Sequence, residues 1–182
     1  PNIPPMHSSR TANRPVEVAL LSDLHFGAVD FAHEKWTDFV QWIRTSPDAK
    51  HIEYILIAGD LVEGIGVYPD QHNELAILDI HDQYELCGRA LSQLPSDIDI
   101  ISISGNHDSV RLAAPQPAIS SDLTSSFPDN VTLVGNPSEI VLEGVVFFLY
   151  HGMSLNSLND AVPGLDIHTP TDAMQLMLEK RH

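Results

Sequence analysis

Positive charge is what this sequence has little of. Its 182 residues contain 9 lysines and arginines against 25 aspartates and glutamates, which gives a formal net charge of −16. A surface of this kind repels nucleic-acid backbones and anionic membranes. A role on nucleic acid would therefore need bound cations or a basic partner subunit to offset the repulsion, and adaptation to a salty cytoplasm would explain the same excess of acid.

Cysteine and long apolar runs are scarce as well. The single cysteine, Cys87, allows no internal disulfide, and it lies in a helical pattern with no evident basic neighbour. We expect it to be a small buried residue rather than a nucleophile. No apolar run approaches the ~18 residues that a membrane-spanning helix needs. With 43% hydrophobic and 19% charged residues, the composition predicts a soluble, cytoplasmic globular protein.

Strand and helix patterns alternate along the chain. Apolar runs typical of strands occupy residues 16–21, 54–58, 98–103 and 145–150, with shorter ones at 132–136 and 139–143. Helical periodicity covers residues 31–44 and recurs from Ile77 to Leu94, where Pro95 stops it. We predict an α/β fold with a largely parallel central sheet. Residues 1–15, with four prolines, are expected to be a linker or N-terminal extension, and residues 16–182 the domain.

Polar residues follow four of the predicted strands. They are Asp23-Leu24-His25, Gly59-Asp60, Gly105-Asn106-His107-Asp108 and His151-Gly152. In a parallel sheet the carboxyl ends of the strands share one edge, where ligands bind. Aspartate, asparagine and histidine side chains gathered there suit Mn, Fe or Zn, and the lack of a thiolate disfavours a structural zinc site. Each motif alone is compatible with an ordinary turn, but the four in this order predict a metal centre.

The four motifs resemble the signature of the calcineurin-like metallophosphoesterase superfamily, which runs D-x-H, G-D, G-N-H-[DE], H-G and a late G-H-x-H. From about Pro15 onward the chain also resembles the small, exonuclease subunits of archaeal family D DNA polymerases. The segments that carry this second resemblance are Gly64 to Gln71, Gln83-Tyr84, Gly105 to Arg111, Pro115-Gln116-Pro117, Gly135-Asn136-Pro137 and Tyr150 to Ser154. The superfamily fold implied is a pair of stacked mixed β-sheets flanked by helices, an αββα sandwich.

The resemblance implies a role for each polar residue at the strand ends. Asp23 and His25 would bind one divalent ion, Asn106 and His151 a second, and Asp60 would bridge the two. We expect Mn as the metal, with Fe, Zn or Mg as alternatives. His107 would protonate or stabilise the leaving oxygen rather than bind metal.

Three further residues each have two interpretations. Glu63 stands where related phosphatases place an aspartate that orients the catalytic histidine, and it also fits a solvated loop carboxylate. Arg111 would hold a phosphate in bidentate fashion or form a structural pair with a carboxylate. Tyr68 would stack on an unpaired base at a primer end or pack the loop.

One element of the superfamily pattern is missing from this sequence. The late G-H-x-H does not occur, and the chain runs from Pro1 to His182 without an oligonucleotide-binding-type domain ahead of the phosphoesterase part. We therefore expect a truncated piece of a longer polypeptide, in which the phosphoesterase domain lacks its C-terminal part. The parent protein is a better candidate for an enzyme than this piece.

The resemblance implies a two-metal phosphodiesterase that acts as a 3′→5′ proofreading exonuclease. Its partners would be a large catalytic polymerase subunit and the single-stranded or mismatched 3′ end of DNA, with no membrane involved. Two alternatives stay open. One is a non-catalytic scaffold subunit of a polymerase complex, and the other is a phosphatase of the same superfamily.

Overall fold

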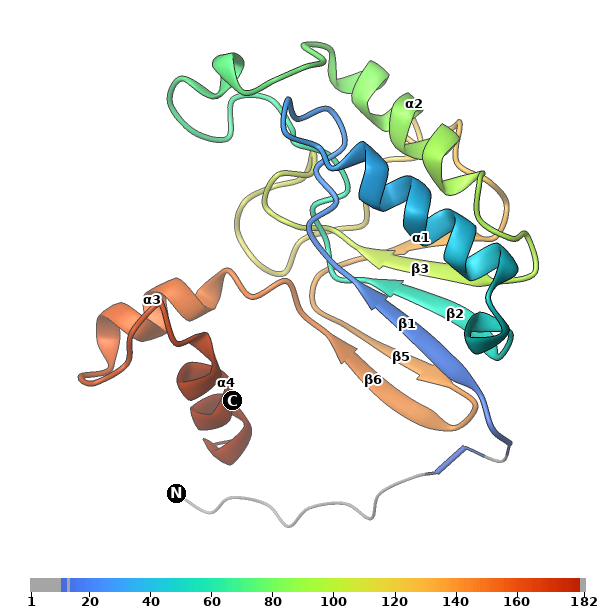
Figure 1. Cartoon of the computed structure of the whole chain (residues 1–182). Coiled ribbons are helices and arrows are strands. Elements are labelled where there is room, and N and C mark those ends of the chain that lie inside the picture. Colours follow the sequence, from blue (N-terminus) through green and yellow to red (C-terminus); the bar gives the residue numbers. More distant parts are fainter. Residues whose placement is uncertain (1–10, 13, 181–182) are drawn as a thin grey trace. The chain divides into compact units, whose positions relative to one another are not determined.

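The computed structural model describes residues 11–12 and 14–180 of the chain (Figure 1). These residues fall into two compact units, a larger one within residues 11–151 and a smaller one within residues 152–180, which are described separately. Most of the predicted linker, residues 1–10 and 13, lies outside the described residues. Arg14 forms ion pairs with Glu53 and, at 2.8 Å, with Glu143. Within the described part of the chain, no helix is both long and apolar enough to cross a bilayer.

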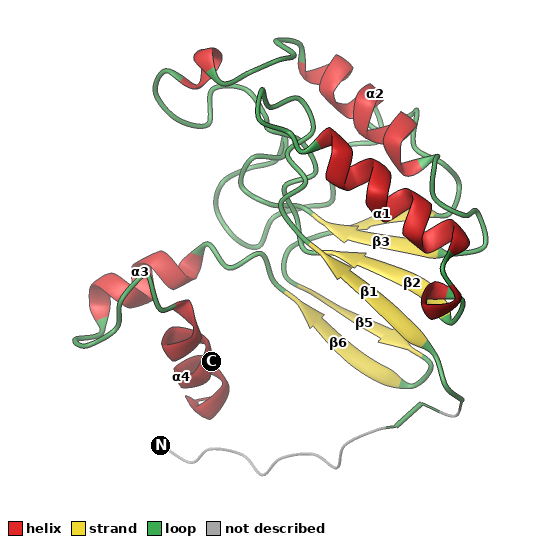
Figure 2. Ribbon diagram, in the orientation of Figure 1, coloured by secondary structure: helices red, strands yellow, loops and turns green. Residues whose placement is uncertain are grey.

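The larger unit is built on a parallel sheet with the strand order β1-β2-β3-β4. The strands are β1 (Glu17–Leu21), β2 (Ile52–Ile57), β3 (Asp99–Ile103) and β4 (Val131–Val134). Helix α1 (His33–Thr45) follows β1 and helix α2 (Ile80–Leu91) follows β2, and both lie on the same face of the sheet (Figure 2). Two single turns, η1 (Pro47–Ala49) and η2 (Gln71–Asn73), complete these connections. The predicted α/β fold with a parallel sheet is confirmed.

Helix α2 is shorter than its apolar pattern predicts. It begins at Ile80 because the side chain of Asp79 caps it, accepting hydrogen bonds from the backbone N–H groups of His81 and Asp82. Ile77 therefore lies before the helix, although it shares the same apolar spacing. Cys87 is fully buried on the inner side of α2, as predicted, and burial raises the pKa of its thiol.

A second sheet covers the other face of the first. It is an antiparallel hairpin of β5 (Ser138–Leu142) and β6 (Val145–Leu149). Its two-residue turn places Glu143 and Gly144 at φ values of 50° and 85°, the left-handed backbone that tight hairpins require. The buried residues form two hydrophobic cores, one between the parallel sheet and the helices and one between the two sheets. Alternate residues of the parallel strands point to opposite faces, so Ile55 and Ile57 pack in the first core and Leu56 packs in the second. The two stacked sheets of the predicted fold are thus present.

The smaller unit contains α3 (Ser154–Ala161) and α4 (Pro170–Lys180), which pack against each other. Helix α4 is the last element of the described residues and ends at Lys180. His182, the last residue, lies outside the described residues.

Two leucines side by side in the parallel sheet test the packing of the hairpin. Leu20 of β1 and Leu56 of β2 are register partners, yet Leu20 is 70% exposed and Leu56 only 2%. We expect Leu56→Ala to lower the free energy of unfolding by about 2–5 kcal/mol, because it opens a cavity under the hairpin. The matched control Leu20→Ala should change it by less than about 0.5 kcal/mol. Urea unfolding measures both, and equal losses would show that the hairpin does not bury Leu56.

Candidate metal centre

The loops after β1 and β2 stay paired beyond the ends of the strands. The backbone N–H of Asp23 donates to Gly59 O, and that of His25 donates to Asp60 O, each at 3.1 Å. Asp23, His25 and Asp60 have φ values of 55°, 50° and 53°. Non-glycine residues rarely adopt this left-handed backbone, and it concentrates at functional sites that the surrounding structure holds in place. The backbone strain thus coincides with three of the predicted metal ligands.

Two glycines let the strand ends approach closely. A Cβ atom at position 105 would lie 2.1 Å from Asp60 Oδ1, and one at position 59 would lie 2.8 Å from His151 Nδ1. Both distances are too short for real atoms, so a side chain at either position would displace Asp60 or His151. Gly59 and Gly105 therefore leave the space that these two side chains occupy.

Asp60 occupies the centre of the cluster. Its side chain is 3% exposed, and its Oδ2 lies 3.7 Å from His25 Nε2 and 3.3 Å from His151 Nε2. On one side, His25 Nε2 is also 3.7 Å from Asp23 Oδ1. On the other side, His151 Nε2 lies 2.8 Å from Asn106 Oδ1. The structure thus brings together all five predicted ligands, with Asp60 between an Asp23–His25 half and an Asn106–His151 half.

Each of the three histidines of the site presents the same ring nitrogen. His107 Nδ1 lies 2.7 Å from Glu63 O and His151 Nδ1 lies 2.7 Å from Ala58 O, and a carbonyl oxygen can only accept. His25 Nδ1 lies 2.7 Å from the Glu63 carboxylate. Nδ1 is therefore the donor in all three rings, which leaves Nε2 for a metal or a substrate. Such second hydrogen bonds orient the histidine ligands of metal sites.

Neighbouring carboxylates shift the pKa values of the site. Burial alone would lower the pKa of His151, but the hydrogen bond and charge of Asp60 outweigh it and raise the pKa to about 9. The carboxylate of Asp23 raises the pKa of His25, and His25 in turn lowers the pKa of Asp23. Without a metal, a proton on the His151 imidazole therefore offsets part of the carboxylate charge of this cluster.

Glu63 is buried, which rules out its interpretation as a solvated loop carboxylate. The predicted contact with His107 is made mainly by the main chain of Glu63. The carboxylate contacts His25, whereas His107 Nδ1 is 3.6 Å from Glu63 Oε1 but only 2.7 Å from the Glu63 main-chain carbonyl. The short chain segment after Asp60 turns its backbone toward His107, so the carbonyl rather than the side chain holds that ring.

Tyr68 and Arg111 both have protein partners. The Tyr68 hydroxyl lies 2.6 Å from Glu74 Oε2 and 3.1 Å from Glu63 Oε1, and these carboxylates, Glu74 first, raise its pKa. Its ring centroid lies 6.0 Å from that of His107. The Arg111 guanidinium donates through Nε to the carbonyl of Pro115 at 2.9 Å, so its structural partner is main chain and not the carboxylate considered as an alternative.

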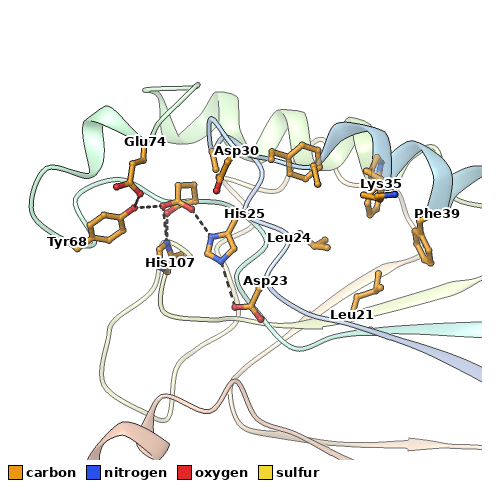
Figure 3. Close-up of a pocket in the computed structure, with 15 residues that line it drawn as sticks. Leu21, Asp23, Leu24, His25, Asp30, Lys35, Phe39, Tyr68, Glu74 and His107 are labelled. Carbon is orange, nitrogen blue, oxygen red and sulfur yellow. Dashed lines mark hydrogen bonds and ion pairs between the residues drawn. The ribbon is translucent and has the colours of Figure 1, made fainter. Parts of the chain in front are cut away.

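A cleft of about 640 Å³ opens beside this cluster. Figure 3 shows Asp23, His25 and His107 on its wall, with Tyr68 and Glu74 at one end. Leu21 at the end of β1 and two residues of α1, Lys35 and Phe39, line the opposite end. Of the five candidate metal donors, Asp23 and His25 therefore line this cleft.

Three buried residues of the site were not assigned a role by the sequence. Asp108 accepts hydrogen bonds from the backbone N–H of Gly105 at 2.8 Å and of Leu61 at 3.1 Å, and burial raises its pKa to about 6. Gln71 donates to the Glu63 carboxylate at 3.0 Å. Gln83 accepts from the backbone N–H of Gly64 at 2.8 Å. All three lie in segments that carry the family resemblance, and this position was the only feature of the sequence that pointed to a role for them.

The donor set fits divalent metal ions. Two carboxylates, two imidazoles with Nε2 available and one amide oxygen are ligands for hard to borderline cations such as Mn²⁺. Candidate ligand atoms of Asp23, Asp60 and His151 all lie within 4.8 Å of one another. The space that Gly59 and Gly105 leave open is filled by the donors themselves. The residues present can therefore hold the ions that the four motifs predict.

Comparisons with known proteins agree with this geometry. Residues 16–180 match the model of the family described as calcineurin-like phosphoesterase. The chain is 46% identical to the DNA polymerase II small subunit of Halobacterium salinarum, over 100% of this chain and 36% of that protein. It is 40% identical to the subunit of that name from Archaeoglobus fulgidus (98% and 38%) and 39% to that from Thermoplasma acidophilum (100% and 38%). The chain thus spans little more than a third of the length of these relatives.

Asp108 provides a test of how the site is held together. In Asp108→Asn one oxygen remains to accept from Leu61, but an NH₂ group would face the N–H of Gly105. A buried donor left without an acceptor costs about 1–3 kcal/mol, so we expect the free energy of unfolding to fall by that amount. Urea unfolding measures the change, with Asp122→Asn at an exposed position as the control. If the two variants are equally stable, Asp108 does not hold the loops.

Proposed function

Because this chain belongs to the calcineurin-like phosphoesterase family, we propose that its metal centre hydrolyses phosphodiester bonds and acts as a 3′→5′ exonuclease. The observation that carries the proposal is the position of the buried Asp60 carboxylate, with one imidazole at 3.7 Å and another at 3.3 Å from the same oxygen. A carboxylate between two half-sites is the arrangement expected of a bridging ligand for a metal pair.

The two halves supply the remaining ligands. Asp23 and His25 would hold one ion and Asn106 and His151 the other, with Mn²⁺ as the first candidate. When bound, the pair supplies positive charge at the scissile phosphate and lowers the pKa of the attacking water. This local charge also offsets the repulsion between an acidic protein and a nucleic-acid backbone.

His107 is the proposed general acid. Its Nδ1 donates to the Glu63 carbonyl, a partner that also suits the charged imidazolium, so Nε2 is the nitrogen that can deliver a proton to the leaving oxygen. The carboxylate of Glu63 assists indirectly, because it fixes the ring of the proposed ligand His25 at 2.7 Å. Glu63 is thus a positioning residue for both histidines, through its side chain for one and its carbonyl for the other.

The relatives supply the proposed substrate and partner. They are small subunits of DNA polymerase II, so we propose a 3′ end of DNA, single-stranded or mismatched, as substrate and a large polymerase subunit as partner. The location of Tyr68 on the cleft wall beside His107 supports a contact with the terminal nucleotide. Arg111 is the second proposed substrate contact, through the guanidinium donors that Pro115 does not occupy.

A non-catalytic scaffold subunit is the second candidate function. The relatives are named small subunits of DNA polymerase II, and this name is compatible with a scaffold because it states no activity of the subunit. The five clustered ligands and the oriented His107 favour the enzyme instead, because a scaffold has no need of either.

Cleavage of a labelled primer with a mismatched 3′ end, in the presence of Mn²⁺, distinguishes an exonuclease from a non-catalytic scaffold. For the full-length protein we expect stepwise release of nucleotides, and His107→Asn should lower kcat about 10²–10⁴-fold while Mn²⁺ binding stays intact. His81→Asn, which changes an exposed histidine in the same way, is the control. Wild-type protein that binds Mn²⁺ without cleaving the primer would instead indicate a scaffold or a phosphatase.

Metal binding should displace protons from the site. Because the pKa of His151 is about 9 in the metal-free protein, this imidazole is protonated at pH 7 and must lose its proton to bind a metal. We expect release of about one proton from His151 at pH 7, and tighter Mn²⁺ binding as the pH rises from 7 to 9. Calorimetry in two buffers of different ionisation enthalpy measures the release. Equal heats in both buffers would contradict the assignment of His151 as a ligand.

A further inference from the structure

Two buried amide side chains connect the ends of the Asn106–His151 half of the site. The backbone N–H of His151 donates to Asn136 Oδ1 at 3.1 Å, and Asn136 Nδ2 donates to Gln116 Oε1 at 2.6 Å. Gln116 Nε2 in turn donates to the carbonyl of Gly105 at 3.2 Å. Since Gly105 precedes Asn106, whose Oδ1 lies 2.8 Å from His151 Nε2, the hydrogen bonds form a closed circuit.

The orientation of both amides in this circuit is determined. Gln116 Nε2 faces two carbonyl oxygens, those of Gly105 and, at 3.0 Å, of Arg111, so it must be the NH₂ group. Its oxygen then requires a donor, which is Asn136 Nδ2, and this leaves Asn136 Oδ1 for the N–H of His151. The two residues are only 4% and 2% exposed. An alternative amide orientation would place like groups against each other in a buried region.

The backbone fixes the two amides relative to each other as well. Gln116 and Asn136 exchange N–H to carbonyl hydrogen bonds of 2.7 and 2.9 Å, as an isolated antiparallel bridge. A Cβ atom at Gly135 would lie 2.7 Å from Gln116 O, so this glycine permits the close approach. The pair is therefore a rigid link rather than a chance contact between loops.

The circuit matters because His151 comes from a different sheet than the other ligands. Asp23, Asp60 and Asn106 follow β1, β2 and β3 of the parallel sheet, whereas His151 follows β6 of the hairpin. The placement of the His151 ring relative to Asn106 therefore depends on the register between two stacked sheets. Asn136 lies two residues before the first hairpin strand and Gln116 lies between β3 and β4, so their hydrogen bond links the two sheets next to the site.

We infer that Gln116 and Asn136 are positioning residues that set the geometry of the Asn106–His151 half of the metal centre, and only of that half. This inference rests on the proposed two-metal function. The amide groups contact the backbone on both sides of the Asn106–His151 pair, whereas the Asp23–His25 half is fixed by Glu63 and by backbone bonds to the β2 loop. Loss of the amide link should therefore weaken the binding of one of the two metal ions.

The test is a two-site Mn²⁺ titration of the protein, followed by calorimetry and by the electron paramagnetic resonance signal of the coupled ion pair. Gln116→Met keeps the side-chain volume but removes every hydrogen bond of the amide. Asn136→Asp keeps the acceptor for His151 and removes the donor to Gln116. Gln93→Met, at an exposed position, is the matched control. Asn106→Ala identifies which of the two binding events belongs to this half.

We expect both variants to bind the ion identified by Asn106→Ala about 10–100-fold more weakly than wild type, the usual effect of removing a group that orients metal ligands. The other ion should bind with unchanged affinity, and the coupled signal should need correspondingly more Mn²⁺. Gln93→Met should behave as wild type. The use of two different substitutions, with the thermal unfolding of each recorded, separates misfolding from mispositioning.

Three results would overturn the inference. Folded variants with wild-type affinity at both sites would show that the amides do not position the ligands. Equal weakening of both sites would show that the amides support the whole fold rather than one half. Wild-type protein that fails to bind two ions would contradict the proposed function itself and remove the basis of the inference, whereas the first two results leave that function intact.

Discussion

The buried carboxylate of Asp60 is the constraint on which the whole site depends. A buried carboxylate is unfavourable unless opposite charge and hydrogen bonds compensate for its lost hydration. Here the compensation comes from the His107 backbone N–H at 2.8 Å to Oδ1 and from two imidazoles near Oδ2. Position 105 next to it is glycine, where a Cβ atom would lie 2.1 Å from Asp60 Oδ1. The loops of the site hold the His107 N–H and the imidazoles of His25 and His151 around this one carboxylate.

Hydrogen bonds from residues outside the proposed ligand set orient the side chains of the site. The imidazoles of His25, His107 and His151 are each held by Nδ1 and present Nε2, and each acceptor is itself part of a strand end or of a buried loop. The carboxylate of Asp108 joins the loops after β2 and β3. The amides of Gln116 and Asn136 join the parallel sheet to the hairpin. The ligands are thus fixed by groups that would never contact an ion.

Much of the fold and of the cluster follows from the sequence, for definite reasons. Apolar runs typical of strands alternate with helical periodicity, and parallel strands place their carboxyl ends at one edge, so the convergence of Asp23, Asp60 and Asn106 was predictable. The partners of Glu63 were not, because its side chain and its carbonyl point to different histidines and no spacing distinguishes them. Nor could Gln116 and Asn136 be paired, since their contact depends on how two sheets stack. The roles of the ligands themselves stay predictions.

Diffraction at the manganese absorption edge tests the central claim most directly. Crystals of the protein soaked in Mn²⁺ should show two anomalous peaks about 3.5–4 Å apart, the separation typical of two-metal sites. We expect Asp60 to contact both peaks, with Asp23 and His25 at one and Asn106 and His151 at the other. A single peak, or a pair of peaks that Asp60 does not bridge, would contradict the account.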